Sequence, residues 1–384
     1  ASISASVVYN GSLYVGTNKA NAAEVYRYNG DALGTWTKVS NATAGTILTT
    51  ANIDMISSMT VYNGYLYIGT QEPNAAEIYR YDGGTSWTKV SAAAAGTILT
   101  TTLIDGVSSM VVFGGRLFAG TKESIRAEVY MYNGGTTWVA VTGTAGTLVA
   151  TNTVTQDAIT QMVVWNNQLI VGTLDATDAD VLRWNGIVGA NNFFALNLAS
   201  TTGSYLIDNA AQTGYIEVSS MAVWAGKLIV GLRRGASQAD ILMYQGFPTG
   251  AAPINSWTRL NSAFGTIITA SIDSVSAMTV YSGRLYVGTT EPNGAEIYRY
   301  DQGKSWTRVS QNTVGMIASG GTGSIDGIST LISYNHNSLF AGTLEGTTAE
   351  GYVYQASIDQ SYALKFHAGA SQAGGEQNNN LNLG

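Results

Sequence analysis

The chain has 384 residues, a formal net charge of −7 at pH 7, only 11% charged residues and no cysteine. The absence of cysteine excludes disulfides, thiolate metal sites and cysteine nucleophiles. The acidic balance and the lack of any apolar run approaching the ~18 residues that span a bilayer lead us to expect no nucleic-acid partner and no membrane insertion.

One sequence pattern recurs along the whole chain. A phrase of the form LYVGT, followed by AEVYRY and TWTKVS, returns seven times in altered form. We number the repeats 1 to 7 by the glycine that ends the first phrase: Gly16, Gly69, Gly120, Gly172, Gly231, Gly288 and Gly342. A repeat of this size is a supersecondary unit that must bury its apolar surface against its neighbours.

Repeat 2 shows the expected strands most clearly. An apolar, β-branched run at 56–63 ends in Asn63-Gly64, which predicts a tight hairpin because such turns need positive φ. Return strands are expected at 65–70, 76–81 and 86–91. Each repeat is therefore predicted to be a four-stranded antiparallel meander.

Seven such meanders predict an all-β fold, a seven-bladed β-propeller of four-stranded antiparallel blades. A solenoid is the competing architecture, but a meander this wide suits radial stacking better. We expect the propeller to occupy 1–367, followed by a low-complexity tail at 368–384. The chain begins with a first strand and ends after a fourth, which predicts closure without a strand exchanged between the termini.

Several motifs resemble known propeller families. The turn before the fourth strand reads Asp82-Gly83-Gly84-Thr85-Ser86-Trp87 in repeat 2, is matched at 301–306, and has a weaker form at 133–138. It resembles the Asp-box of sialidase-like propellers, whereas the strand order resembles kelch repeats. The "LYVGT…GAEVYR…W" phrase is most similar to that of uncharacterised bacterial and phage propeller proteins. This resemblance implies the fold and suggests a phage or bacterial-surface setting.

Two sets of carboxylates recur. The first opens the third strand, and its members either tie the blades together or form a ring of ligand sites: Glu24, Glu77, Glu128, Asp180, Asp240, Glu296 and Glu350. The second precedes the first strand, at the expected channel mouth: Asp54, Asp105, Asp157, Asp273 and Asp326. These aspartates either satisfy loop backbone as Asx-type turns or bind a ligand or a cation such as Ca²⁺. Repeat 1 has Ala1 at this position and repeat 5 has Ile216.

Aromatic residues end the first strand in every repeat, where they either pack between blades or offer stacking platforms for sugars. They are Tyr9, Tyr62, Phe113, Trp165, Trp224, Tyr281 and Tyr334. Repeats 4 and 5 depart most from the pattern, with inserts at 187–192, 201–214 and 247–255. Repeat 5 also carries Arg233-Arg234, which would hold an anion or a carboxylate-bearing sugar unless the pair is simply solvated.

Enzyme chemistry finds little support in the sequence. The two histidines, His336 and His367, have no Ser-His-Asp spacing, and Arg27, Arg80 and Arg299 fall in the third strand rather than at the channel. We therefore expect a non-enzymatic interaction module without a cofactor, apart from the Ca²⁺ option, that binds a cell-surface glycan or protein. A low-charge, hydroxyl-rich surface suggests an extracellular or virion location, as a phage tail or fibre component or an adhesin. The alternatives are an architectural subunit that docks other chains of an appendage or virion, and a sialidase-like enzyme.

Overall fold

The computed structural model of the chain is all-β, and the residues that it describes form strands and no helix. It describes residues 2–31, 34–99, 101–149, 155–177, 179–189, 192–197, 204–208, 210–246, 256–318, 323–335, 338–345, 353–358 and 364–367. Within these ranges no helix has the length and apolarity needed to cross a membrane.

Each sequence repeat forms four strands in chain order. Repeat 1 contains β1 (Ser2–Tyr9), β2 (Ser12–Asn18), β3 (Val25–Tyr28) and β4 (Trp36–Lys38). Repeat 2 contains β5 (Met55–Tyr62), β6 (Tyr65–Gln71), β7 (Ile78–Gly83) and β8 (Ser86–Lys89). Repeat 3 contains β9 (Gly106–Phe113), β10 (Arg116–Lys122), β11 (Val129–Gly134) and β12 (Thr137–Ala140). Repeat 4 contains β13 (Ala158–Trp165), β14 (Gln168–Leu174), β15 (Val181–Trp184) and β16 (Phe193–Ala195).

The remaining repeats follow the same order. Repeat 5 contains β19 (Glu217–Trp224), β20 (Lys227–Arg233), β21 (Ala239–Gly246) and β22 (Ser256–Arg259). Repeat 6 contains β23 (Ser274–Tyr281), β24 (Arg284–Thr290), β25 (Ile297–Gln302) and β26 (Ser305–Arg308). Repeat 7 contains β27 (Gly327–Tyr334), β28 (Ser338–Leu344), β29 (Val353–Ile358) and β30 (Leu364–His367).

Within each repeat the strands pair antiparallel with their neighbours in sequence. In repeat 2, β5 pairs with β6, β6 with β7 and β7 with β8, so the expected four-stranded meander is confirmed. Its third strand begins at Ile78 rather than at residue 76. The reason is that the backbone N–H of Ala76 donates to Ile104 O of repeat 3, at 3.0 Å, and that of Glu77 donates to Thr70 Oγ1, at 2.9 Å.

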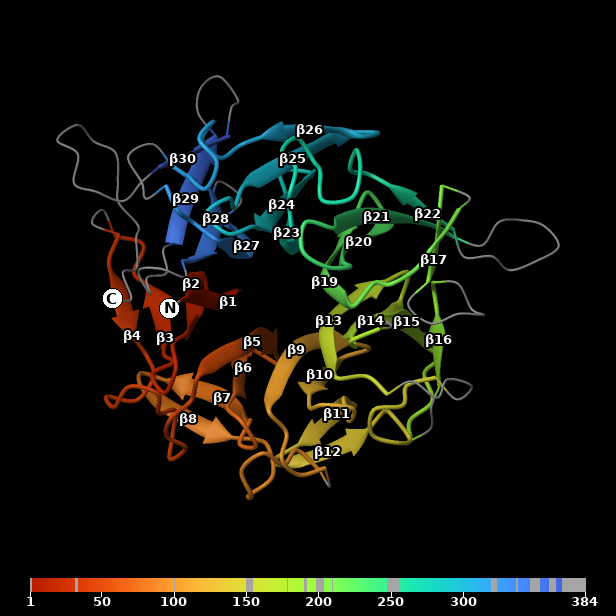
Figure 1. Cartoon of the computed structure of the whole chain (residues 1–384). Coiled ribbons are helices and arrows are strands. Elements are labelled where there is room, and N and C mark those ends of the chain that lie inside the picture. Colours follow the sequence, from red (N-terminus) through yellow and green to blue (C-terminus); the bar gives the residue numbers. More distant parts are fainter. Residues whose placement is uncertain are drawn as a thin grey trace.

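The repeats lie around a common centre, with the first strand of each innermost and the fourth at the periphery (Figure 1). A belt of hydroxyl groups joins the inner strands, because each donates to a backbone carbonyl of the next repeat. The pairs are Ser4 to Ile56, Ser57 to Val107, Ser108 to Ile159, Thr160 to Val218, Ser219 to Val275, Ser276 to Ile328 and Ser329 to Ile3. The first six distances lie between 2.7 and 2.9 Å. The last pair joins repeat 7 to repeat 1.

The glycine of the LYVGT phrase lies where adjacent repeats approach most closely. A Cβ atom on Gly120 would lie 2.5 Å from Cγ2 of Ile159, and one on Gly342 would lie 2.7 Å from Cβ of Ile3. These distances are far shorter than van der Waals contact, so the backbone can approach the next inner strand only where the side chain is absent.

The apolar core lies between the repeats. One cluster combines Tyr14 of repeat 1 with Ile56 and Trp87 of repeat 2, and every one of these side chains is buried. The indole Nε1 of Trp87 also donates to the backbone O of Val39 in repeat 1, at 2.9 Å. Burial of this shared surface holds neighbouring meanders together, because a single meander has no core of its own.

An insert between repeats 4 and 5 supplies a hairpin, β17 (Tyr205–Ile207) and β18 (Ala210–Gln212). Strand β17 pairs in parallel with β22, the outer strand of repeat 5, and the N–H of Asp208 donates to Trp257 O at 3.0 Å. The described part of the 201–214 insert therefore covers a strand edge that would otherwise present unpaired backbone groups. The insert at 247–255 lies outside the described residues.

The first and last repeats meet without exchanging a strand. Strand β1 pairs with β2 and makes one bridge to β28, between Ser2 and Leu344. The hydroxyl of Tyr334 donates to Gly11 O at 2.9 Å, and the rings of Tyr28 and Phe340 lie 5.6 Å apart. The described strands agree with the predicted mode of closure.

Candidate functional site

Each member of the aspartate set binds the preceding repeat. Its carboxylate accepts a backbone N–H from the loop between the second and third strands of that repeat. The pairs are Asp54 with Asn21 (2.8 Å), Asp105 with Asn74 (2.8 Å), Asp157 with Ile125 (2.7 Å), Asp273 with Ser237 (2.6 Å) and Asp326 with Asn293 (2.7 Å). These loops and the fourth-to-first loops form one face of the molecule, which we call the loop face.

The aspartates hold loop tips in an unusual backbone conformation. The donors have left-handed backbone, with φ of 55° at Asn21, 59° at Asn74 and 53° at Asn293. Such residues persist only when their surroundings fix them. The fourth-to-first loop packs against the same tip, since a Cβ on Gly96 would lie 2.1 Å from Asn74 O. The tip residues are exposed, so their side chains project from a fixed backbone.

All five aspartates satisfy loop backbone, as one of the two expected roles requires, but not as Asx-type turns, because each accepts an N–H from a residue 31 to 36 positions earlier, in the preceding repeat. Among the residues that the structure describes, no group of three or more His, Asp or Glu side chains is placed to hold a metal ion. Direct contact of the aspartates with a ligand stays a prediction.

Three glutamates share this face with the aspartates. Burial raises the pKa of each of them, and the negative charge of a nearby aspartate raises it further. The pairs are Glu72 with Asp54, Glu123 with Asp105 and Glu291 with Asp273. One buried oxygen of each has no hydrogen-bond partner among the described residues. The three glutamate side chains therefore bind a proton more tightly in the folded protein than in the unfolded chain.

We expect the triple variant Glu72→Gln/Glu123→Gln/Glu291→Gln to be more stable than the wild type at pH 7. A raised folded-state pKa means that stability falls as pH rises past the ordinary glutamate pKa, because the folded state then loses protons that it bound more tightly. The amide removes this penalty. Thermal melts should show a rise in Tm of about 1–3 °C at pH 7 and little change at pH 4. An equal gain at both pH values would contradict this assignment.

The described carboxylates that open the third strand are internally paired, and all of them except the half-buried Glu24 are buried. Glu77 accepts from Tyr79 and Lys89. Glu296 accepts from Tyr298 and lies 2.8 Å from Nε of Arg308. Equivalent contacts hold the others: Glu24 with Tyr26 and Lys38, Glu128 with Tyr130, and Asp180 with Asn197. Glu350 lies outside the described residues. These contacts join segments of one repeat, whereas the sequence led us to expect ties between blades. Thr50 and Thr269, in fourth-to-first loops, also donate to Glu77 and Glu296.

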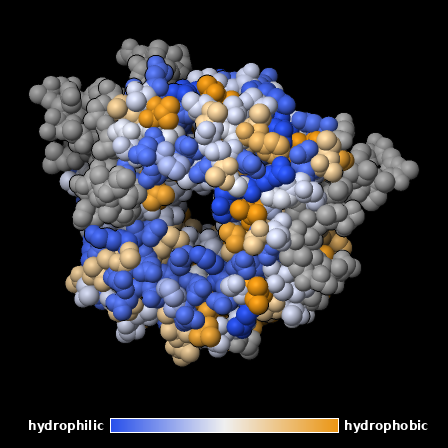
Figure 2. All heavy atoms as spheres, viewed as in Figure 1, coloured by the Kyte–Doolittle hydropathy of each residue, from blue (hydrophilic) through white to orange (hydrophobic). Residues whose placement is uncertain are grey.

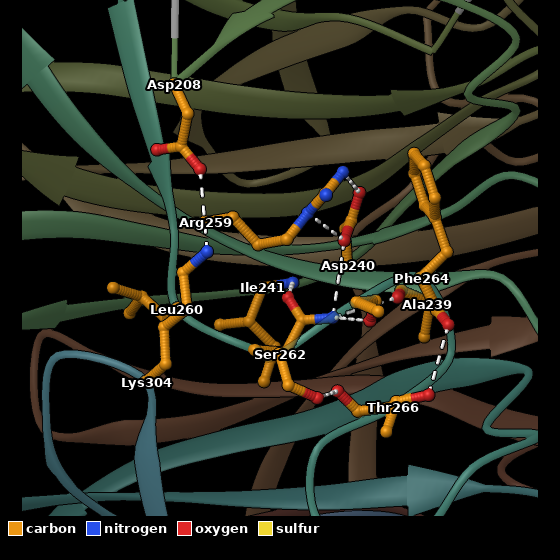
Figure 3. A network of polar contacts seen from close by, with 12 residues as sticks. Asp208, Ala239, Asp240, Ile241, Arg259, Leu260, Ser262, Phe264, Thr266 and Lys304 are labelled. Atoms are coloured by element: carbon orange, nitrogen blue, oxygen red, sulfur yellow. Dashed lines mark hydrogen bonds and ion pairs between the residues drawn. The ribbon is translucent and has the colours of Figure 1, made fainter.

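Asp240 is the member of this set in repeat 5 and has the most elaborate partners (Figure 3). Its side chain is fully buried and lies against Arg259. Asp240 Oδ1 lies 2.8 Å from Arg259 Nε, and Asp240 Oδ2 accepts a hydrogen bond from Arg259 Nη2 at 3.0 Å. The hydroxyl of Tyr215 donates to Oδ2 at 2.5 Å. Burial raises the pKa of Asp240, while the hydrogen bond from Tyr215 and the charge of Arg259 act in the opposite direction.

The Asp-box aspartates also serve the meander. Asp82 accepts from Arg80 Nε at 2.8 Å and from Thr88 Oγ1 at 2.5 Å, which joins the third strand to the fourth. Asp301 makes the same contacts with Arg299 and Thr307. These third-strand arginines are therefore paired within their own repeats.

The aromatics that end the first strand pack on the third strand of the next repeat. Ring centroids lie 6.3 Å apart for Tyr9 and Tyr81, 6.2 Å for Tyr62 and Tyr132, 6.2 Å for Phe113 and Trp184, 5.5 Å for Trp165 and Tyr244, 5.2 Å for Trp224 and Tyr300, and 6.2 Å for Tyr334 and Tyr28. Tyr281 packs on Tyr286 of its own repeat. Packing between and within repeats is confirmed for this set.

The two arginines of repeat 5 do not act as a pair. Arg233 Nε lies 2.6 Å from Oε2 of Glu217, its partner in the β19–β20 ladder. Arg234 has no ion-pair partner among the described residues, and its Cζ lies 5.2 Å from the ring centroid of Phe264. Of the two, Arg234 is therefore the one without a carboxylate partner in the part of the chain that the structure describes.

The central channel is hollow (Figure 2) and is lined mainly by hydroxyls and thioethers. A cavity of about 280 Å³ at one mouth is lined by residues that include Asn18, Glu217 and Thr290. A second, of about 260 Å³, is lined by the hydroxyl belt except Ser219, and by Met59 and Met110. Glu217 is the one ionisable side chain among the described residues that line either cavity, and Arg233 neutralises it.

Sequence reasoning missed Phe264 and Tyr215. Phe264 lies in a loop position that holds alanine in repeats 1 to 3, at Ala44, Ala95 and Ala145. Comparison of the repeats position by position would have shown this exception. Nothing in the sequence pattern indicates that the Tyr215 hydroxyl reaches Asp240.

Comparisons with known proteins define the class of fold. No family model matches the chain, and no curated protein matches it in sequence. The chain is similar in structure to the BP39L lectin from Burkholderia pseudomallei, with a TM-score of 0.55 and 12% identity, over 97% of this chain and 99% of the lectin. It is also similar to a β-propeller domain from Myceliophteria thermophila, with a TM-score of 0.52 and 12% identity, over 89% and 93% of the two chains.

A third similar structure comes from an analysis of two prolyl endopeptidases, with a TM-score of 0.54 and 12% identity. The match covers 95% of this chain and 49% of the endopeptidase, so this chain spans about half the length of that protein. At 12% identity these likenesses show the fold alone. The chain is an all-β protein with a β-propeller fold built from four-stranded antiparallel units.

Proposed function

We propose that the chain is a seven-bladed β-propeller that acts as a non-enzymatic interaction module outside a cell or on a virion. In this proposal it is a phage tail or fibre component or a surface adhesin, and it binds glycans through the loop face. Support for seven blades comes from the hydroxyl belt, in which each repeat bonds to the next and Ser329 bonds back to Ile3.

The observation that carries glycan binding is a set of four exposed polar tips on the loop face. Asn21, Asn74, Asn293 and Ser237 occupy equivalent loop positions and are exposed. Each has its backbone N–H fixed by an aspartate of the next repeat. Carboxamides and hydroxyls both donate and accept hydrogen bonds, which matches the hydroxyls of sugars. A rigid backbone lowers the entropy cost of using them in binding.

The structural likeness to a lectin supports the same proposal without assigning a ligand. The low content of charged residues also supports glycan binding, because hydroxyl and amide groups can bind sugars without forming an ion pair. We place recognition at the tips because the hydroxyls of the channel belt already donate to backbone carbonyls.

A glycan array of bacterial and animal surface polysaccharides tests this proposal. We expect the wild type to bind at least one class of glycan, and the variant Asn21→Ala/Asn74→Ala/Asn293→Ala to lose at least fivefold in affinity. Asn133→Ala is the matched control, because Asn133 is exposed near the end of β11, at the opposite end of the strands from the loop face. Silence of the wild type on the whole array would overturn the proposal.

An architectural role is the second candidate, and exposed apolar side chains on the loop face favour it. Leu48, Leu99, Ile125 and Ile268 are 43%, 38%, 58% and 50% exposed. Such side chains commonly mark protein contacts when they gather on one face. A silent array, together with loss of particle assembly in Ile125→Ser/Ile268→Ser, would favour docking over glycan recognition.

A further inference from the structure

Arg234 breaks the charge pattern of the loop face. It is the third residue after the repeat glycine, a position that is acidic in most repeats: Glu72, Glu123, Asp175, Glu291 and Glu345, with Lys19 in repeat 1. The aspartates before the first strands lie on the same face. Arg234 thus places a cation where most other repeats place a carboxylate, and no described carboxylate pairs with it.

The side chain of Arg234 lies close to two other segments. Its Cζ lies 5.2 Å from the ring centroid of Phe264. A Cβ on Gly214, in the insert before repeat 5, would lie 3.3 Å from its Nε. Arg259 approaches the same ring, at 4.2 Å, but its guanidinium is occupied by Asp240. Arg234 is therefore a positioned guanidinium whose N–H donors have no acceptor among the described residues.

This setting selects the charge of a ligand. A guanidinium fork binds a carboxylate through two parallel hydrogen bonds. The carboxylate of Asp273, which accepts the N–H of Ser237 in the same loop as Arg234, would repel a ligand that carries several negative charges. A ligand with a single negative charge meets Arg234 without that cost. Ser237, Gln238 and Ser262 are exposed in the same loops, and their short polar side chains suit sugar hydroxyls.

We propose that Arg234, positioned by Phe264 and Gly214, binds the carboxylate of an acidic sugar residue within an otherwise uncharged glycan. This inference rests on the proposed function and refines it, since it assigns one site and one ligand class. It also separates the two arginines of repeat 5: Arg234 is the binding residue, and Arg233 serves to neutralise Glu217.

The test is an NMR or calorimetric titration with methyl glucuronide, with methyl glucoside as the uncharged control. We expect Arg234→Glu to weaken methyl glucuronide binding at least tenfold, Arg234→Lys to have an intermediate effect, and Phe264→Ala to weaken binding about threefold to tenfold. Both Arg234→Glu and Phe264→Ala restore side chains that other repeats carry at these positions, so the fold should tolerate them. Arg116→Ala, in an exposed arginine at the opposite end of the strands, is the control.

Each result bears on the proposal. Equal affinity of wild type and Arg234→Glu for methyl glucuronide would overturn it, as would stronger binding of methyl glucoside, a sulfated sugar or an acetylated dipeptide with a free C-terminus. If neutral glycans on the array bind wild type and Arg234→Glu alike, the proposed function stands and this inference fails. If no glycan of any kind binds, both fail.

Discussion

Gly120→Ala is expected to lower the free energy of unfolding by about 3 kcal/mol, at the upper end of the cost of overpacking a core. The new Cβ would lie 2.5 Å from Cγ2 and 2.6 Å from Cβ of Ile159. A Cβ atom cannot rotate away as the end of a flexible side chain can. Gly120 is also held from both sides, by pairing with Ser109 in β9 and Val129 in β11.

Chemical denaturation measures this effect, and Gly106→Ala is its matched control. A Cβ on Gly106 would meet nothing closer than 3.4 Å, and its φ is not positive. We expect the control to change stability by less than 1 kcal/mol. The double variant Gly120→Ala/Ile159→Ala should lose less stability than the sum of the losses in the two single variants. The reason is that removal of the Ile159 side chain makes room for the new methyl group. Equal stability of Gly120→Ala and Gly106→Ala would refute the close-approach explanation.

Asp240→Ala is expected to cost about 3–5 kcal/mol, the range for loss of one partner from a buried ion pair. Arg259 would be left with an unpaired charge whose side chain is only 16% exposed. The hydroxyl of Tyr215 would lose its hydrogen-bond acceptor, and the Tyr215 side chain is fully buried. The penalty comes mainly from these stranded partners and exceeds the net value of the pair itself.

Asp82→Ala provides the comparison, because Asp82 pairs with Arg80 where both side chains are about 30% exposed. We expect it to cost less than 1 kcal/mol. Asp240→Ala/Arg259→Leu should recover part of the stability lost in Asp240→Ala, since no charge then remains buried. Urea denaturation of the wild type, the two single variants and the double variant measures these differences. Equal losses of stability in Asp240→Ala and Asp82→Ala would show that burial of the ion pair with Arg259 does not set the cost of losing Asp240.

The strands could be predicted from the sequence because their signals are local. Asn63-Gly64 lies between two strand-forming runs, and such runs recur in every repeat although the turn residues between them vary. The position of Gly120 was equally visible. The reason for a glycine at this position could not be predicted, because the atoms that leave no room for a side chain belong to Ile159 in the next repeat.

The candidate site was less predictable, because its contacts cross between repeats or arise from exceptions. The sequence left two roles open for Asp105, since the N–H of Asn74 that it accepts lies 31 residues earlier. The pairing of β17 with β22 joins short segments about 50 residues apart in the chain, and no periodicity marks it. Arg233 and Arg234 looked alike in sequence, yet only the first has a carboxylate opposite it in the strand ladder.

The hydroxyl belt has a consequence for the order in which the molecule folds. Ser57 reaches its acceptor across 50 residues of chain, whereas Ser329 reaches Ile3 across 326. In an unfolded chain, loop closure over the longer span costs about 1.7 kcal/mol more entropy. Neighbouring repeats can therefore dock early and in any order, as an open arc. We therefore expect the contact between the two ends to form late, and to be the first boundary between repeats to open transiently in the native state.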